Sequence, residues 1–234
     1  MSRLRPVLAL LCALVALTSC TPDKSKTTAS PSAASLPAGD TLVTESAAAM
    51  RDIKTAKFLI TADGAVAGLS LRRAEGTLTK EGSAKGTVQV DQGGTLVELS
   101  FVIVGDKIYL KGPTGGYQAL PLAVAASVYD PSAILDPQRG IAKVLSTATG
   151  ATTEASDPVD GKPAWRVAAT MSAADLKTVI PGVTGTVPGK VWISADDKRL
   201  LKATFTLPAA GDAKGGTVTV TFTEFDAPAT INAP

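Results

Sequence analysis

The sequence predicts an α+β domain in which a few helices pack against one large antiparallel sheet. Residues 217–223 (TVTVTFT) alternate strictly between threonine and apolar side chains, a period-two pattern typical of a strand with one wet and one dry face. Further alternating segments are separated by tight-turn sequences, and capping residues mark three helices. Strands joined by tight turns favour an antiparallel arrangement, and helices against such a sheet define the α+β class.

The first nineteen residues predict a signal peptide. Arg3 and Arg5 precede an apolar run at 7–17, and the small residues Thr18 and Ser19 lead to Cys20. A charged start, a short apolar core and small residues at the cut site are typical of secretion signals, and the run is too short to span a bilayer core comfortably. A cysteine directly after the cut is typical of a bacterial lipoprotein, in which the thiol is diacylated and becomes the N-terminus. The alternative is an ordinary signal peptide with a chance cysteine.

Two further regions follow the signal peptide. Residues 20–39 carry the lipidated Cys20 and a polar stretch rich in Ser, Thr, Ala and Pro, which buries too little apolar surface to fold and predicts a flexible tether. Residues 40–234 then form one domain by the usual size of domains. We therefore expect a protein held by lipid to the extracytoplasmic face of the cell membrane.

Several strands are predicted within this domain. Leu201, Ala203, Phe205 and Leu207 share one face of a strand, and Val88 and Val90 share the face of another. A further alternation places the apolar residues of 97–103 opposite Glu98 and Ser100. Turns are predicted at 91–94, 105–106 and 195–198 from their Gly and Asp content.

Three helices are predicted from their caps. Asp40 or Thr41 begins a helix whose apolar stripe comprises Leu42, Ala49, Met50 and Ile53. Asp136 before Pro137 predicts a second helix start, with Ile141, Val144 and Leu145 on one side. Ser172 and Asp175 resemble a capping box that opens a short third helix ending before Pro181.

Composition excludes several kinds of site. The chain has no histidine, and its second cysteine, Cys12, lies within the predicted signal peptide. We therefore expect no cofactor, no Cys or His metal site, and no Ser-His or Cys-His catalytic pair. Without Arg3 and Arg5, 21 basic residues balance 21 acidic ones, and no basic cluster indicates nucleic-acid binding.

The apolar content permits two interpretations. The chain is 45% hydrophobic but only 4% aromatic. Small side chains could fill an ordinary core, or the sheet could curve around an apolar cavity, as curved sheets do when side chains do not fill them. Composition alone leaves both open.

A family resemblance favours the cavity. The sequence resembles the mycobacterial LppX/LprAFG lipoprotein family in residues 128–137 (VYDPSAILDP), 140–145 (GIAKVL), 68–71 (GLSL) and 191–193 (VWI), in order along the whole domain. The resemblance implies a half-barrel sheet with helices on its concave side, related in shape to the LolA/LolB carriers. The sequence departs from those of its relatives at residues 116–121 (GYQALP), where the relatives usually carry a tryptophan.

The resemblance also implies a function. The cavity would receive acyl chains of a glycolipid or triacylglycerol, and the protein would carry lipid across the envelope, in some members beside a major-facilitator transporter. No catalytic group is needed. The alternating residues expected to line the cavity are Phe58, Ile60, Val88, Val90, Leu99, Phe101, Ile103, Phe205, Val220 and Phe222.

Other residues suggest weaker hypotheses. Arg72 and Arg73 are candidates for a headgroup contact, but adjacent strand residues point to opposite faces. Asp196 and Asp197 are interpreted as turn residues, and Trp165 and Trp192 as packing residues.

Two rival functions remain at this level. A hydrolase would need paired carboxylates, and no motif positions such a pair. An envelope scaffold or interaction lipoprotein without bound lipid fits the same sequence.

Overall fold

The computed structural model describes residues 35–66, 69–126, 133–180, 183–209, 211 and 213–234. The predicted signal peptide, Cys20, most of the tether, Gly68 and the first half of the Asp-Pro segment lie outside these residues. Among the described residues, no helix is long and apolar enough to cross a membrane.

The described residues form four helices and eleven strands. The helices are α1 (Gly39–Arg51), α2 (Leu122–Ala126), α3 (Ile141–Ser146) and α4 (Ala173–Leu176). The strands of the first half are β1 (Thr55–Ala65), β2 (Leu71–Thr79), β3 (Ala84–Gln92), β4 (Thr95–Val104), β5 (Lys107–Lys111) and β6 (Gln118–Pro121). Those of the second half are β7 (Thr149–Ser156), β8 (Ala164–Ser172), β9 (Thr186–Ser194), β10 (Leu200–Leu207) and β11 (Gly215–Thr223).

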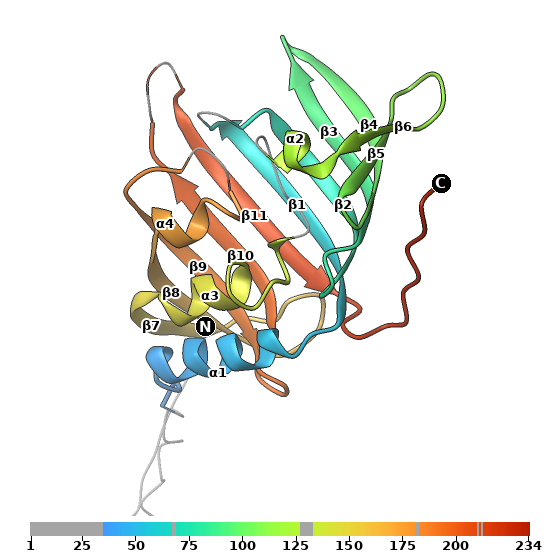
Figure 1. The fold of residues 1–234 in the computed structure, drawn as a ribbon. Helices are drawn as coiled ribbons and strands as arrows, with labels where there is room; N and C mark the ends of the chain where they lie inside the picture. Colours follow the sequence, from blue (N-terminus) through green and yellow to red (C-terminus); the bar gives the residue numbers. More distant parts are fainter. Residues whose placement is uncertain (1–34, 67–68, 127–132, 181–182, 210, 212) are drawn as a thin grey trace, which may run out of the picture. The chain divides into compact units, whose positions relative to one another are not determined.

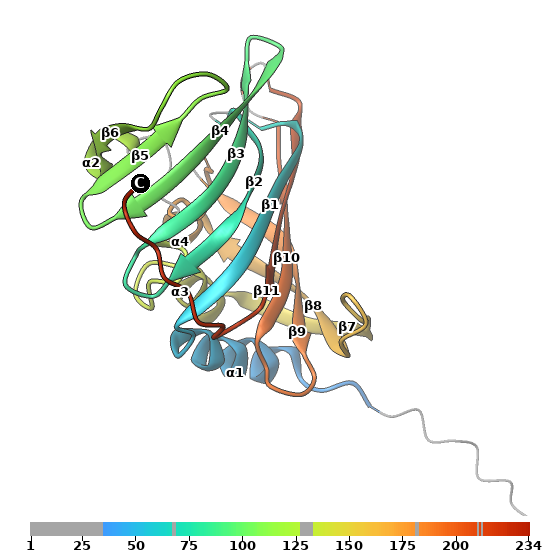
Figure 2. The same cartoon turned by 90° about the vertical axis from the view of Figure 1, so that its right-hand side faces the viewer.

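The strands form a single antiparallel sheet within the described part of the chain. Its order is β6-β5-β4-β3-β2-β1-β11-β10-β9-β8-β7, so two meanders meet where β1 pairs with β11. The sheet curls strongly, and its inner, concave face carries the helices (Figure 1, Figure 2). The predicted class, a large curved antiparallel sheet with helices on the concave side, is confirmed.

The four strands that alternation predicts most completely are present in the structure. β10, β11, β3 and β4 contain the predicted alternating segments, and turns follow Gln92, Val104 and Ser194 as expected. Alternation succeeds here because one face of each strand is buried and the other is solvated.

The first helix begins earlier than predicted. α1 starts at Gly39, with Ala38 at the capping position and Asp40 already in the first turn. Its buried residues are Gly39, Leu42, Val43, Ser46, Ala47 and Met50, so Ala49 is not on the buried stripe. A side chain at Gly39 would meet the backbone of Ala151 and Thr152 at 2.5–2.7 Å, so α1 starts in close contact with β7.

The helix predicted to start at Asp136, α3, begins later than predicted. The helix predicted to start at Ser172, α4, agrees with its prediction. α3 starts at Ile141, and Asp136 instead accepts the backbone N–H groups of Gln138 and Arg139 in the preceding turn. Ile141, Val144 and Leu145 are nevertheless all buried. The Ser172 hydroxyl accepts the Asp175 N–H at 3.3 Å at the start of α4, as the capping box predicts.

A pair of glycines lies side by side on the neighbouring strands β2 and β3. Gly76 is in register with Gly86. A Cβ atom on Gly76 would lie 2.1 Å from the Lys85 carbonyl oxygen, and one on Gly86 would lie 1.9 Å from that of Glu75. Only glycine permits so close an approach of two strands, and glycine pairs of this kind allow a sheet to bend.

Candidate functional site

The inner face of the sheet consists of rows of residues that pair across neighbouring strands. Directly paired residues point to the same side of a sheet, so the register defines these rows. The first row runs Ala56, Leu78, Ala84, Ile103, Ile108, Leu120, and the second row runs Phe222, Phe58, Gly76, Gly86, Phe101, Leu110. The third row runs Val167, Val191, Ala203, Val220, Ile60, Ala74, Val88, Leu99.

All ten residues predicted to line a cavity lie on this face. Eight of them belong to the three rows, and Val90 and Phe205 occupy the next level, paired with Val97 and Val218. Seven are buried, namely Phe58, Ile60, Phe101, Ile103, Phe205, Val220 and Phe222. Val88, Val90 and Leu99 are only half-buried. Contact of any of the ten with lipid stays a prediction.

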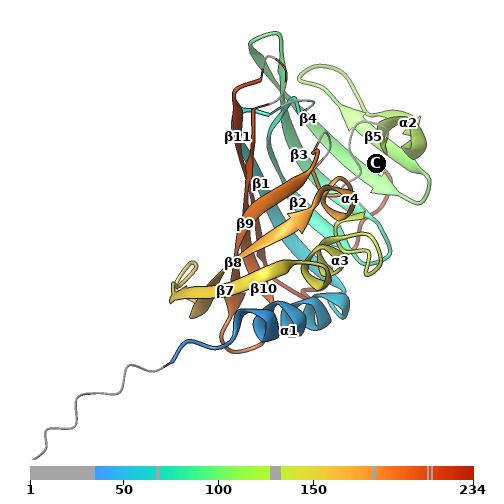
Figure 3. The same ribbon diagram turned by 90° about the vertical axis from the view of Figure 1, so that its left-hand side faces the viewer.

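Burial changes along the third row. α1, α3 and α4 pack over β7, β8 and β9 (Figure 1, Figure 3). Val167, Val191, Ala203 and Val220 are 0% exposed, while Val88 and Leu99 at the other end of the row remain half-exposed. The half-exposed apolar residues of this face on β3, β4 and β5 are Val88, Val90, Val97, Leu99 and Leu110, and we call them the open strip.

Sequence reasoning missed part of the open strip. Alternation places Val97 on the correct face of its strand, but Val97 is not among the ten residues expected to line a cavity, and Leu110 lies outside the strands predicted above. The alternation of Ile108 and Leu110 around Tyr109, directly after the turn at 105–106, could have identified this short strand.

Small residues lie beside the open strip. Ala74 pairs with Val88, and Gly76 and Gly86 occupy the second row between Phe58 and Phe101. These positions carry at most one carbon beyond Cα. The inner face beside the open strip is therefore apolar and includes small side chains.

The outer face of β7–β9 carries a network of charges instead. Arg166 contacts Glu154 at 2.9 Å and Asp157 at 2.7 Å, and Lys190 contacts Glu154 at 2.9 Å. Hydrogen bonds from Lys190 and then Arg166 lower the pKa of Glu154. The Trp192 indole N–H donates to Asp157 at 2.9 Å, and this bond and the one from Arg166 lower the pKa of Asp157. These carboxylates are held ionised, which suits a stabilising role rather than proton donation.

Neither arginine of the proposed headgroup pair is directed at the open strip. Arg72 donates to the Gly64 carbonyl oxygen and contacts Asp91 at 3.0 Å, and the N–H of Gly94 together with Arg72 lowers the pKa of Asp91. Arg73 contacts Glu75 on the outer face at 2.6 Å. Trp192 packs beneath Lys202, whose Nζ lies 4.5 Å from the ring centroid, in line with the packing role expected for it.

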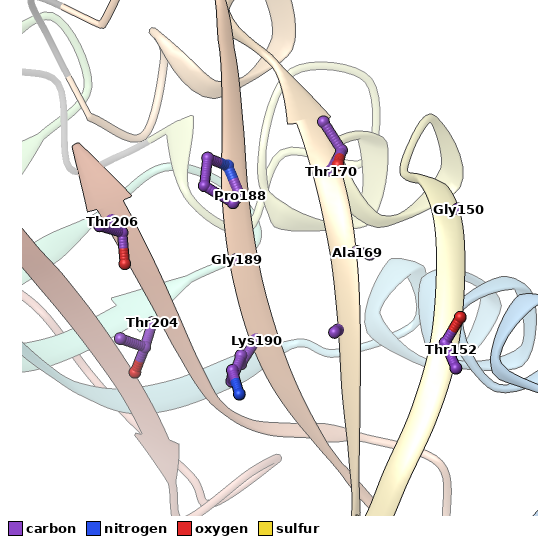
Figure 4. Close-up of a pocket in the computed structure, with 10 residues that line it drawn as sticks. Gly150, Thr152, Ala169, Thr170, Pro188, Gly189, Lys190, Thr204 and Thr206 are labelled. Atoms are coloured by element: carbon purple, nitrogen blue, oxygen red, sulfur yellow. The ribbon is translucent and has the colours of Figure 1, made fainter. Parts of the chain in front are cut away.

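A pocket of about 360 Å³ lies on the outer face (Figure 4). Its lining comes from β7–β10 and consists of Gly150, Thr152, Ala168, Ala169, Thr170, Pro188, Gly189, Lys190, Thr204 and Thr206. None of the predicted lining residues belongs to it. Its hydroxyl groups and lysine make it a poor container for acyl chains.

The described residues contain no group of three or more acidic, Cys or His side chains that could hold a metal ion. Asp197 accepts the Arg199 N–H in the turn between β9 and β10, which is the turn role expected for it.

The sequence is similar to those of known lipoproteins. The family model of the LppX_LprAFG lipoproteins matches residues 38–231 of this chain. The lipoarabinomannan carrier protein LprG of Mycolicibacterium smegmatis is 32% identical over 206 residues, covering 86% of this chain and 85% of that protein. LprG of Mycobacterium tuberculosis is 31% identical over 177 residues, 74% of each. LprG is also the member of the family that the sequence motifs resemble most.

Two solved structures share the fold. LprF from Mycobacterium bovis superimposes with a TM-score of 0.72 at 22% identity, covering 84% of this chain and 96% of that one. The lipoprotein LppX of Mycobacterium tuberculosis gives a TM-score of 0.62 at 19% identity, covering 82% of this chain and 97% of that one. The curved sheet with helices on its concave face is therefore a fold common to these lipoproteins.

Proposed function

This chain belongs to the LppX_LprAFG lipoprotein family, and from this premise we propose that it is a membrane-anchored lipid carrier. In this proposal it holds the acyl chains of a glycolipid or triacylglycerol against its inner face and carries the lipid across the cell envelope. The name of the LprG relatives, lipoarabinomannan carrier protein, supports a lipid bearing a glycan headgroup.

The open strip is the observation that carries the proposal. Helices bury the inner face over β7–β9, whereas Val88, Val90, Val97, Leu99 and Leu110 stay half-exposed. Adjacent apolar side chains left open to water mark a site that binds something apolar. No charged or catalytic group is needed for such binding.

The energetics are adequate for a carrier. Each methylene removed from water contributes about 0.8 kcal/mol, so a chain of about sixteen carbons gains very roughly 10 kcal/mol before ordering costs. The polar headgroup would remain at the rim in water. A carrier of this kind binds tightly yet makes no covalent bond that must later be broken.

Lipid extraction tests the proposal directly. The purified protein, extracted with organic solvent, should yield a multi-acylated lipid detectable by mass spectrometry. Leu99→Asp should abolish this lipid, because a carboxylate in the open strip would lose its hydration when an acyl chain covered it.

The neighbouring residue supplies the control. Ser100 lies on the opposite side of β4 from Leu99, so Ser100→Asp adds the same charge to the outer face and should leave lipid content unchanged. A native protein that yields no lipid favours the scaffold function. Equal lipid in both variants would show that lipid binds elsewhere than on the open strip.

A further inference from the structure

Exposed apolar side chains gather at one edge of the sheet. Within the described part of the chain, the exposed large hydrophobic residues are Leu36, Leu96, Tyr117, Leu120 and Val124. Three of these lie within eight residues, directly before β6, on β6 and on α2, with exposures of 41%, 40% and 61%. We call Tyr117, Leu120 and Val124 the rim patch.

The rim patch continues the apolar inner face. Leu120 is in register with Ile108, which pairs with Ile103. Exposure in this first row rises from 0% at Ile103 through 6% at Ile108 to 40% at Leu120. An unbroken apolar path therefore leads from the core to the free edge at β6, and Leu110 of the open strip lies two residues from Ile108.

Basic residues flank the rim patch. Lys107 and Lys111 are exposed at the two ends of β5, and Lys111 Nζ lies 5.9 Å from the centre of the Tyr117 ring. Between Val104 and Val124 the charged residues are these two lysines and Asp106. Tyrosine and aliphatic side chains beside lysines match the interface of a bilayer that contains anionic lipids.

The opposite edge of the sheet receives the N-terminal segment. The Thr153 hydroxyl on β7 donates to the Pro37 carbonyl oxygen at 2.6 Å, and β7 and β6 are the two ends of the sheet (Figure 2, Figure 3). The residues from Cys20 to Ala38 could span at most about 60 Å. An anchor at Cys20 therefore keeps the domain close to a membrane, while β6 lies at the edge far from the segment at which the tether joins the domain.

We propose that the rim patch, with Lys107 and Lys111, docks on the surface of an anionic lipid bilayer, so that acyl chains pass between membrane and open strip across β6. This inference rests on the proposed carrier function and adds to it the route by which lipid enters. The bilayer is favoured over a protein partner because the apolar path is continuous with the lipid-binding face and because Lys107 and Lys111 lie at the same edge of the sheet, on the other face of β5.

Vesicle binding without the anchor tests the docking surface. The mature chain, residues 20–234, carries Cys20→Ser so that no acyl group contributes, and it retains all described structure. It should co-sediment with vesicles of phosphatidylcholine and phosphatidylglycerol in equal parts. Tyr117→Ser with Leu120→Ser should weaken binding roughly tenfold or more, and Lys107→Gln or Lys111→Gln roughly fivefold each.

Leu36 provides a matched control. Its exposure of 43% equals that of Leu120 within a few per cent, but it lies beside β7. Leu36→Ser should leave vesicle binding unchanged. If it weakens binding as much as the rim variants, or if the rim variants bind as well as the parent chain, the docking proposal is overturned.

Lipid extraction from the same chains separates the two proposals. Rim variants should lose vesicle binding and transfer a fluorescent diacyl lipid between vesicles more slowly, yet retain lipid acquired during expression. If the parent chain carries lipid but does not bind vesicles, the docking proposal is overturned and the carrier function remains supported. A parent chain that binds vesicles through the rim patch but carries no lipid has the docking surface and lacks the carrier function.

Discussion

Ser46 is a buried hydroxyl at the centre of the face that α1 turns to the core. It is 0% exposed, and its oxygen has no hydrogen-bond partner among the described residues. A buried polar group without a partner loses its hydration and gains nothing in return. Ser46→Ala should therefore raise the free energy of unfolding by about 1 kcal/mol, measured by urea denaturation.

Ser194 is the matched control for that substitution. It is also buried, at 5% exposure, but its hydroxyl oxygen accepts the Asp197 N–H at 3.3 Å. Ser194→Ala should lower the stability by about 1 kcal/mol, because it leaves that N–H without its partner. If Ser46→Ala lowers the stability as Ser194→Ala does, the Ser46 hydroxyl must have a partner.

Val88 and Val191 test the open strip at the level of single side chains. Both belong to the third row, but Val191 is 0% exposed beneath the helices and Val88 is half-exposed. Val191→Trp should destabilise the domain by about 3 kcal/mol or more through overpacking. Val88→Trp should fold with a melting temperature near that of the lipid-stripped native protein and lose bound lipid, because the indole occupies the space proposed for an acyl chain.

Thermal melting and lipid extraction together check this pair of variants. If Val88→Trp unfolds as readily as Val191→Trp, then Val88 lies in a tight core. If it folds and keeps its full lipid content, Val88 does not line the site. Either result would also question the assignment of Val90 and Leu99 on the same face.

Alternation predicted on which face of the sheet a side chain lies, but not how deeply that side chain is buried. All ten candidates lie on the inner face because a period of two relates side chains within one strand. The contrast between buried Val220 and half-exposed Val88 depends on what packs against each side chain in the folded domain. That packing involves residues far away in the sequence, so no local pattern could separate core from open strip.

At the level of elements, the close pairing of β2 with β3 depends on the Gly76–Gly86 pair. A Cβ on Gly76 would lie 2.1 Å from the Lys85 oxygen and 2.8 Å from the Gly86 Cα. Since both are backbone atoms, no flexible side chain can move aside. Gly76→Ala should destabilise the domain by about 2–3 kcal/mol and reduce lipid binding by flattening the sheet beside the open strip.

Gly116 is the control for this prediction. A Cβ there would meet nothing within 4 Å, so Gly116→Ala should be neutral or stabilise by up to about 1 kcal/mol. Melting temperatures and near-UV circular dichroism compare the two variants. Equal melting temperatures would mean that the strands can separate at Gly76 without cost.

Helix existence was more predictable than helix boundaries. The Ser172–Asp175 capping box located α4 correctly because the cap is a local interaction. α1 begins before Asp40 because Gly39 packs against β7, which is a tertiary contact. α2, with five residues and no capping side chain described, was not predicted at all.

The proposed anchor concerns the whole molecule, because it would decide where the domain works. Cys20 follows a predicted small-residue cut site and would be the cysteine left after removal of residues 1–19. Intact-mass analysis of the membrane fraction should show a diacylglyceryl addition and the loss of those residues. Cys20→Ala should release the protein from the membrane fraction, and an equally membrane-bound Cys20→Ala protein would disprove the anchor.

The stability of the whole domain should depend on bound lipid. A ligand that binds only the folded state stabilises it by RT ln(1 + [L]/Kd), about 2.7 kcal/mol when the free ligand is at one hundred times Kd. For a domain of this size that corresponds to a shift of about 5–10 °C. Stripping lipid from the mature protein should lower the melting temperature by this amount, and adding a multi-acylated glycolipid should restore it.

The Leu99→Asp and Ser100→Asp variants make this measurement specific to the inner face. Leu99→Asp should melt at the temperature of the stripped protein whether or not glycolipid is added, because its open strip no longer accepts acyl chains. Ser100→Asp should respond to glycolipid as the native protein does, since its new charge lies on the outer face. Identical melting curves for the native protein with and without lipid would favour the scaffold function. A lipid-dependent shift that survives Leu99→Asp would place the bound acyl chains away from the open strip.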